Sequence, residues 1–255
     1  MAEASVAPKW APHLALKCKK CDIIGHMSQK LIWPTQLDDA MKLNIDLARR
    51  GLADIIYDQA VLEGIATTRA DTVAIVRGQK VHDMLPDDVV KTHNLKQAWD
   101  FVLRESVILV PTSLDLICDI NKIVQAGLSY HAGILRSVPV KISGTSWQPA
   151  LPYESVVREE LAHILAGPAS EQVAWQLLLY VMKKQIFLDG NKRTAVLVAN
   201  HYLVAHGLGM VAIPADKVPV FEKLLIGFYE SDKETDLLEF LTSRCWQKLP
   251  QASIY

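Results

Sequence analysis

One short polar stretch inside a long apolar region constrains this sequence more than any other feature. Residues 185–193, QIFLDGNKR, place a carboxylate, a glycine, an asparagine and two cations between apolar runs at 173–182 and 195–205. Both runs are typical of helices that are apolar most of the way round, which belong in the centre of a domain. Charged groups at such a place need hydrogen bonds, a metal or an anion to offset the cost of their burial.

The order of these residues favours an anion-binding loop. Gly190 allows the backbone to come close to a ligand and to turn into the next helix. That helix would begin near Asn191, so its unpaired N–H groups and positive dipole end, together with Lys192 and Arg193, would form a cradle for phosphate. Asp189 could hold a Mg²⁺ ion that bridges phosphates. The alternative is that Asp189 caps the helix and the cations are solvated, and the spacing alone leaves both open.

Residues 187–195 resemble the signature of the Fic/Doc (Fido) family, which runs His-x-Phe-x-Asp/Glu-Gly-Asn-Gly/Lys-Arg. Members of this family transfer AMP, and less often other phosphate-containing groups, to hydroxyl side chains. The resemblance covers roughly residues 35–247. It implies an all-α, mainly helical fold with a small β-hairpin flap, and ATP or a related nucleotide with Mg²⁺ as cofactors. It assigns phosphate binding to residues 190–193 and the metal to Asp189.

Two positions depart from the family pattern and bear on catalysis. The family places its catalytic histidine where this sequence has Gln185, and Arg193 is the other motif residue assigned to catalysis. Glutamine does not titrate, so it cannot take a proton from the attacking hydroxyl, a loss of about 10²–10⁴-fold. Many AMP-transferring members carry a second arginine three residues after the motif arginine, where this sequence has Val196. Its absence, with Thr194 and Ala195, resembles the Doc branch, which acts as a protein kinase.

Three hypotheses for the function therefore stay open. The first is a protein adenylyltransferase whose catalysis is altered or weakened by Gln185. The second is Doc-like phosphoryl transfer, and the third is a pseudoenzyme that binds nucleotide or a partner without chemistry. The nearest histidines on either side of the motif, His163 and His201, are not assigned as substitute bases. Almost three helical turns separate His201 from Asn191.

A second segment, residues 59–68 (QAVLEGIATT), resembles the inhibitory helix that precedes many Fic cores. Glu63 with the following glycine, and the threonine pair at 67–68, match that pattern, whereas Gln59 replaces the usual Ser or Thr. In the family the glutamate reaches the γ-phosphate pocket and blocks productive binding, so the resemblance implies an inhibitory role for Glu63. Without the second arginine, the two loop cations are the partners left for it. The alternative is a helix that simply ends at the glycine.

Residues 132–149 (AGILRSVPVKISGTSWQP) resemble the Fic flap, with a Gly-x-x-Arg beginning and a Gly-Thr-Ser-Trp-x-Pro end. Apolar residues alternate with others between 138 and 143, which predicts a half-exposed strand and a turn at 143–144. The resemblance implies that a target protein docks along the flap by strand addition. The residues assigned to docking are Val138, Val140, Lys141, Ile142, Gly144 and Thr145. A hairpin that only covers the core is the alternative.

The periodicity and the resemblance together divide the chain into an N-terminal arm (1–34), a helical region with the inhibitory-helix-like segment (35–110), the core that the resemblance identifies as Fic-like (111–247) and a tail (248–255). Further helices are predicted over 35–50, 88–104, 113–125, 151–166, 170–184, 191–206, 215–230 and 235–247. Thr35 is the predicted N-cap of the first of these helices. A short extended piece is predicted at 211–214.

Composition bounds the partners. Half of the 255 residues are hydrophobic, as in a globular protein, and the net charge of −1 gives no reason to expect binding to nucleic acid or membrane. No apolar run reaches the ~20 residues that span a bilayer. Four cysteines without framework spacing favour a reducing compartment, so we expect a cytoplasmic protein. Cys18 and Cys21, near His13 and His26, lack the second half of a zinc site. A homodimer is left open.

Overall fold

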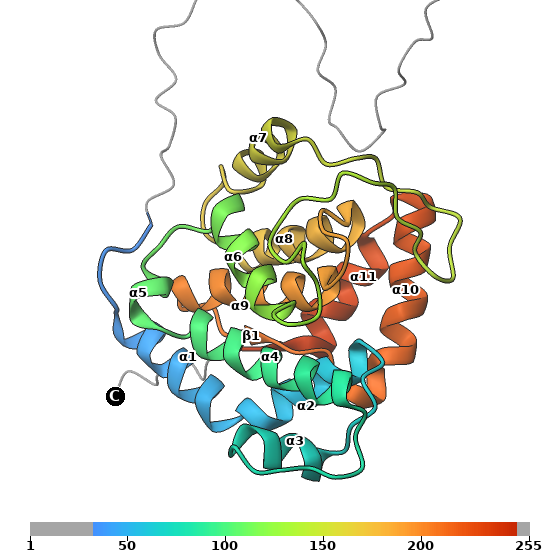
Figure 1. Ribbon diagram of the computed structural model, residues 1–255. Coiled ribbons are helices and arrows are strands. Elements are labelled where there is room, and N and C mark those ends of the chain that lie inside the picture. Colours follow the sequence, from blue (N-terminus) through green and yellow to red (C-terminus); the bar gives the residue numbers. More distant parts are fainter. Residues whose placement is uncertain (1–32, 249–255) are drawn as a thin grey trace, which may run out of the picture.

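The computed structural model of the chain describes residues 33–248. This part is mainly helical and carries one small antiparallel sheet, which confirms the predicted fold class (Figure 1). The helices are α1 (Asp39–Arg50), α2 (Leu52–Leu62), α3 (Arg69–Val76), α4 (Pro86–Val102), α5 (Glu105–Ile108), α6 (Leu114–Val124), α7 (Glu154–Ile164), α8 (Glu171–Lys184), α9 (Asn191–Ala205), α10 (Val218–Ser231) and α11 (Thr235–Phe240). The Cys18–Cys21 segment and nearly all of the predicted arm and tail lie outside the described residues.

Helices α8 and α9 form the centre of the fold, as their apolar sequences predict. Every residue of α9 except Lys192 is buried. Helix α8 packs along it, and α6, α4, α5 and α1 complete its surroundings (Figure 1). The helix begins at Asn191 and ends before Gly207, whose φ of +65° is the left-handed conformation that stops a helix. The motif loop therefore lies between the two most buried helices.

Local capping places the other helices close to their predicted bounds, with one correction. Ser113 caps α6 by accepting a hydrogen bond from the Leu116 amide. The predicted cap at Thr35 is wrong, because α1 begins at Asp39 and Asp38 accepts from the Met41 amide at 2.8 Å. Both residues are good N-caps. Asp38 takes the role because it directly precedes the amphipathic run.

The small sheet pairs β1 (Met210–Val211) with β2 (Trp246–Gln247). The extended piece predicted at 211–214 overlaps β1 only at Val211, and the closing helix predicted over 235–247 ends early. Helix α11 ends at Phe240 and passes through a π-helical turn (Leu241–Cys245) into β2. The pairing of β2 with β1 replaces the end of the predicted helix, and a hydrogen bond from the Ala212 amide to the Cys245 carbonyl extends this pairing by one position. Tertiary contacts therefore outweigh local helix propensity there.

The predicted flap hairpin is wrong. In the described structure, residues 138–149 form no strand and no ladder, although the turn at 143–144 is present and Gly144 has a φ of +81°. Pro139 and Pro149 have no N–H to give to a ladder. The carbonyls of Val138 and Pro149 accept instead from the guanidinium of Arg136, at 2.9 and 3.1 Å. The flap is therefore an irregular loop closed by a side chain.

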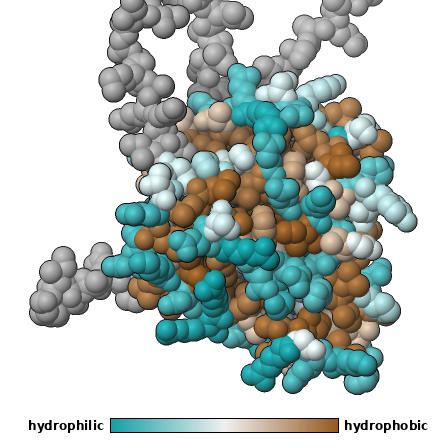
Figure 2. All heavy atoms as spheres, turned by 60° about the vertical axis from the view of Figure 1, so that its left-hand side comes forward, coloured by the Kyte–Doolittle hydropathy of each residue, from teal (hydrophilic) through white to brown (hydrophobic). Residues whose placement is uncertain are grey.

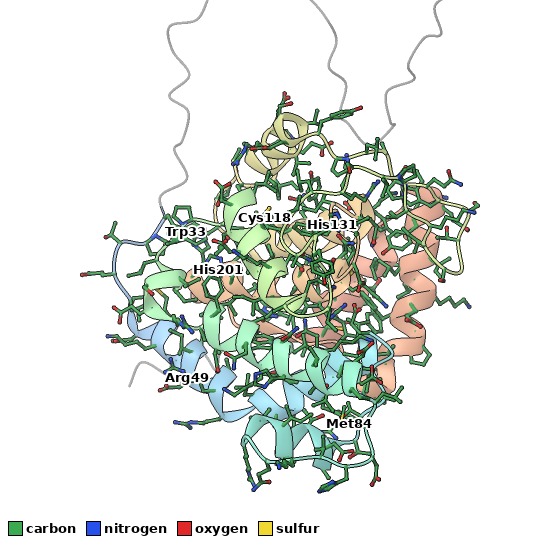
Figure 3. All side chains as sticks on the ribbon, in the orientation of Figure 1. Trp33, Arg49, Met84, Cys118, His131 and His201 are labelled. Atoms are coloured by element: carbon green, nitrogen blue, oxygen red, sulfur yellow. The ribbon has the colours of Figure 1, made fainter. Side chains whose placement is uncertain are left out.

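The beginning of the described chain packs on the central helix. Trp33 stacks on His201 with ring centroids 5.6 Å apart, and its Nε1 donates to the Ile108 carbonyl (Figure 3). On the face shown in Figure 2, hydrophobic and hydrophilic side chains are interspersed. No helix within residues 33–248 is long and apolar enough to cross a membrane.

Candidate functional site

The motif loop joins α8 to α9 through two residues with left-handed backbone. Gln185 has a φ of +46° and Gly190 a φ of +76°. A Cβ added to Gly190 would lie 3.2 Å from Nδ2 of Asn121 in α6 and 2.6 Å from Nε2 of Gln125, the residue after that helix. Only glycine fits this position without strain. Both the backbone conformation and the close packing therefore require a glycine at the turn into α9, as the sequence predicted.

Asn191 closes the loop on itself. Its Oδ1 accepts from the Phe187 amide at 3.0 Å, and its Nδ2 donates to the Phe187 carbonyl at 2.8 Å and to Oε1 of Gln185 at 3.0 Å. Asn191 is therefore a brace for the loop as well as the first residue of α9. Its side chain is used entirely within the loop, so its predicted part in phosphate binding would have to come from its backbone N–H.

Asn121 is a site residue that the sequence analysis missed. It is buried on α6, and its Nδ2 donates to the Asp189 carbonyl and to Oγ1 of Thr194, both at 3.1 Å. Its Oδ1 accepts from the Gly133 amide at 2.9 Å, at the start of the flap. One amide thus ties the motif loop to the flap. An asparagine on the apolar face of a predicted helix was the signal that could have found it.

The first turn of α9 keeps its backbone N–H groups free. Gly190 is the N-cap and no side chain caps the helix. Asp189 does not cap it either. Its Oδ1 accepts from the amide of Gly190, which precedes the first residue of the helix, at 2.7 Å. Within residues 33–248 the N–H groups of residues 191–193 have no acceptor. Three donors and the positive dipole end of a buried helix therefore share one place.

Arg193 is buried, with 2% of its side chain exposed, and it meets two carboxylates. Its Nε lies 3.2 Å from Oε2 of Glu63, and its Nη2 lies 3.3 Å from Oδ2 of Asp189. Its Nη1 is buried without an acceptor in the described structure, as Oε1 of Glu63 is without a donor. The sequence left Lys192 and Arg193 open as partners of Glu63, and in the structure the partner is Arg193. The ion pair uses only part of the hydrogen-bonding capacity of each group.

The C-terminal end of α2 covers this turn with two further contacts, from Leu62 and Gln59. Lys192 donates from Nζ to the Leu62 carbonyl at 2.8 Å, and Glu222 lies 3.7 Å from the same ammonium. Gln59 donates to the Arg193 carbonyl at 2.9 Å and accepts from Trp99 at 2.8 Å. The negative end of α2 thus faces the positive end of α9. Both loop cations are engaged from α2.

Gln185 lies where the resemblance to the motif leads us to expect a histidine, and its side chain turns back onto the end of α8. Its Nε2 donates to the Met182 carbonyl at 2.6 Å. The buried Tyr229 hydroxyl donates to the same carbonyl at 3.1 Å. Burial raises the pKa of Tyr229, and the negative charge of Glu63 adds to the rise, so this phenol stays protonated at neutral pH. Neither side chain is suited to take a proton.

The nearest histidine on each side of the motif loop, His163 before it and His201 after it, does not supply a general base. His201 is fully buried, with Nδ1 at 2.9 Å from the Thr112 hydroxyl and Nε2 at 3.0 Å from the Val107 carbonyl. Burial lowers its pKa to about 4, so it is a neutral core residue. His163 is exposed near the end of α7.

A magnesium site at Asp189 would be an open one. The carboxylate is 63% exposed, and the described residues hold no group of three or more His, Cys, Asp and Glu that could bind a metal. Mg²⁺ is often held by one or two carboxylates, with phosphate oxygens and water completing its octahedron. A single carboxylate next to a phosphate cradle fits that pattern.

The residues assigned to docking occupy both faces of the flap. Val138, Lys141 and Gly144 are exposed, whereas Val140, Ile142 and Thr145 are half-buried. Exposed hydrophobic side chains gather on both sides of this segment. They are Tyr130, Ile134, Val138, Leu151, Tyr153 and Val156, six of the eleven such residues in the described structure. The flap and its neighbours thus present more exposed apolar side chains than any other part described.

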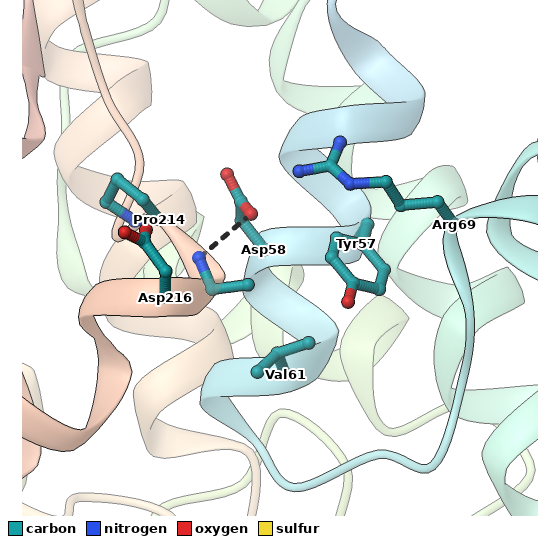
Figure 4. A pocket seen from close by; sticks show the side chains of 7 residues that line it. Tyr57, Asp58, Val61, Arg69, Pro214 and Asp216 are labelled. Carbon is teal, nitrogen blue, oxygen red and sulfur yellow. Dashed lines mark hydrogen bonds between the residues drawn. The ribbon is translucent and has the colours of Figure 1, made fainter.

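A surface hollow of about 520 Å³ lies away from the motif loop, against the outer side of α2 (Figure 4). Its lining comprises Tyr57, Asp58, Val61, Arg69, Pro214, Ala215 and Asp216. Asp58 accepts from the Ala215 amide at 3.0 Å, and Arg69 covers the Tyr57 ring at 4.7 Å. None of the predicted site residues lines it. Its contacts join α2 to the segment that follows β1.

Comparison with known proteins agrees with this geometry. Residues 111–203 match the model of the Fic/DOC family, and this stretch contains the flap and the motif loop. This part of the chain is therefore similar to a Fic/DOC family domain. The comparison with curated protein sequences gives no match.

Solved structures show that the described fold is the Fic fold. A Fic domain containing signaling protein from Bacteroides thetaiotaomicron is 17% identical, with a TM-score of 0.64 over 81% of this chain and 86% of that one. A Fic family protein from Desulfovibrio desulfuricans is 16% identical, with a TM-score of 0.60 over 82% and 73%. Fic-1 (residues 134–508) from C. elegans is 17% identical, with a TM-score of 0.62 over 81% of this chain and 62% of that longer one.

Proposed function

We propose that this chain binds the phosphates of ATP or a related nucleotide at the N-terminus of α9, as a Fic-type protein adenylyltransferase with a diverged active site. The observation that carries the proposal is the buried Nη1 of Arg193, which has no acceptor within the described residues and lies in the same turn as three free N–H groups. A buried donor without an acceptor costs about 1–3 kcal/mol, which a bound anion would offset. Helix N-termini of this kind are anion sites.

The polar residues of the loop and the backbone N–H groups at the start of α9 have separate roles in that binding. Gly190 lets phosphate approach the backbone, and the N–H groups of residues 191–193 donate to its oxygens. Lys192 and Arg193 would add charge-assisted hydrogen bonds on leaving their present acceptors. Asp189 would hold Mg²⁺, which supplies positive charge that neutralises the phosphates. Gln185 can hydrogen-bond to a target hydroxyl but cannot take its proton, so we expect slow transfer or none.

Glu63 would inhibit this binding in the described conformation. Its carboxylate holds Nε of Arg193, and the Leu62 carbonyl next to it holds Lys192. A phosphate has to compete with both contacts. Partly exposed Glu63 (12%) is placed to leave when the end of α2 shifts. The inhibition predicted from the resemblance is therefore proposed to act through the motif arginine, since Val196 occupies the position of the second one.

The partner would be a protein that docks along the flap. Exposed apolar side chains on and around residues 138–144 support this, because concentrated apolar surface marks interaction sites. The main chain of residues 138–149 takes part in no ladder within the described structure, which leaves it free to pair with an extended segment of a target.

Two other functions are each favoured by one residue. Val196, in place of the second arginine, favours Doc-like transfer of the γ-phosphoryl group. Gln185 favours a pseudoenzyme that binds nucleotide or a partner without turnover. Both use the same phosphate site as the leading proposal. They differ from it in the group that is transferred to the target, which is the γ-phosphoryl group in the first and none in the second.

Incubation with α-labelled or γ-labelled ATP and Mg²⁺ separates the three functions. The proteins are the wild type, Gln185→His and, as a non-titrating control, Gln185→Asn, each with host lysate. Transfer of α-label by Gln185→His, with at least about tenfold less by the other two, would support a diverged adenylyltransferase. Transfer of γ-label alone would replace it with the kinase. No label from any of the three would leave a binding module and end the enzyme hypothesis.

A further inference from the structure

Arg136 is a buried arginine whose charge no carboxylate in the described structure neutralises. It is 3% exposed, and each acceptor of its guanidinium is a main-chain carbonyl oxygen. Three of these belong to the two ends of the flap. Nη1 donates to Val138 at 2.9 Å, and Nη2 donates to Pro149 at 3.1 Å and to Ala150 at 2.6 Å. One planar group therefore closes a loop that has no ladder of its own.

The same guanidinium is bonded to the end of α8. Nε donates to the Gln185 carbonyl at 2.6 Å, Nη2 reaches the Lys184 carbonyl at 3.5 Å, and the Arg136 amide donates to the Ile186 carbonyl at 3.0 Å. Carbonyls at a helix C-terminus carry partial negative charge, which suits a buried cation. These contacts are made to Gln185, which has a left-handed backbone, and to its two neighbours in the chain. A non-glycine residue in that conformation needs its surroundings to hold it there.

We propose that Arg136 is a positioning residue that makes the flap and the backbone at Gln185 one mechanical unit, so that placement of the flap fixes the direction of any side chain at position 185. Five donors in a rigid fork can reach carbonyls on both sides at once, which the single ammonium of lysine cannot. The coupling is a property of the fold. Its meaning for group transfer rests on the proposed function, in which the flap positions the target and position 185 faces its hydroxyl.

The tip of the flap is held by separate contacts, which provide a matched control. Thr145 donates to Oε1 of Glu230 at 3.1 Å, and the Trp147 ring lies 4.7 Å from Nζ of Lys183. None of these contacts involves Arg136. Glu230→Gln weakens the tip and leaves the guanidinium in place.

Hydrogen exchange of the whole chain, read by mass spectrometry, tests the coupling in Arg136→Lys and Glu230→Gln. For Arg136→Lys we expect peptides from 137–150 and from 185–189 to exchange at least about tenfold faster together, while α6 and α9 stay protected. For Glu230→Gln we expect faster exchange at 144–147 only. Faster exchange in the flap alone for Arg136→Lys, or in neither segment, would overturn the proposal.

Two further measurements keep the proposal testable if Arg136→Lys folds poorly or the chain proves inactive. The Cα and Cβ chemical shifts of Gln185 report its left-handed backbone, and we expect Arg136→Lys, not Glu230→Gln, to move them. In the wild type, the amides of 137–150 and 185–189 should exchange with the same urea dependence, and different dependences would contradict the coupling. Neither readout involves nucleotide, so a failure to bind ATP would count against the proposed function and not against Arg136.

Discussion

Glu63 and Arg193 form an ion pair that is almost out of solvent, and each keeps one hydrogen-bonding atom unused. A buried pair of this kind adds little net stability, whereas breaking it from one side leaves an uncompensated charge. We therefore interpret the pair as a contact that a bound anion can displace, and not as a source of stability. Its energetics can be measured by removing the partners singly and together.

We predict that Arg193→Met lowers the free energy of unfolding by about 3 kcal/mol, because it leaves Glu63, whose side chain is only 12% exposed, without its ion-pair partner. Glu63→Ala together with Arg193→Met should be clearly less destabilised than Arg193→Met alone. Urea unfolding of the wild type, both single variants and the double variant gives the coupling energy. Additive effects would mean that the two side chains do not interact in solution.

At the scale of elements, the turn into α9 depends on Gly190. Its left-handed backbone would be strained in any residue with a Cβ, and neighbouring side chains pack closely against it. Gly190→Ala should cost about 1–3 kcal/mol, because a Cβ would meet α6 and the backbone is left-handed. Gly227→Ala is the matched control, since a Cβ there meets nothing within 4 Å and α10 should gain slightly. The difference in thermal midpoint between the two variants checks this. Equal midpoints would show that the turn tolerates a side chain.

The elements were largely predictable from the sequence and their tertiary roles were not. The apolar runs around residues 185–193 predicted α8 and α9, and Gly190 predicted the turn between them, because these signals are local. The contact between Glu63 and Arg193 spans 130 positions and depends on how α2 docks, which periodicity does not encode. The flap was predicted as a hairpin from alternation, but the carbonyl acceptors of Arg136 decided its form.

At the scale of the whole molecule, stability should fall in mild acid because a histidine is locked in the core. His201 has its pKa lowered to about 4 by burial, below the ordinary value of 6.5. A lowered histidine pKa means that the neutral form is favoured in the folded state. The stability it contributes is therefore complete above about pH 6.5 and is lost as pH falls towards 4, by an amount on the order of 3 kcal/mol.

Urea unfolding at several pH values between 4 and 7 measures this loss. His201→Gln should flatten the pH dependence in that window, although it lowers stability overall by disturbing the contacts with Thr112 and Val107. The exposed His163→Gln variant is the control and should leave the profile unchanged. An unchanged profile in His201→Gln would show that other groups cause the acid loss.

The central claim is that the start of α9 is a phosphate site which the end of α2 occludes. The most direct test is the dissociation constant for ATP with Mg²⁺, measured calorimetrically for the wild type, Glu63→Ala, Glu222→Gln and the double variant Glu63→Ala with Arg193→Met. We predict that Glu63→Ala binds at least about tenfold more tightly than the wild type, because Arg193 is then free. Glu222→Gln, which removes a carboxylate near Lys192 only, should stay within about threefold of the wild type, and the double variant should lose the gain. Equal affinities for Glu63→Ala and Glu222→Gln, or a gain that survives the loss of Arg193, would contradict the account.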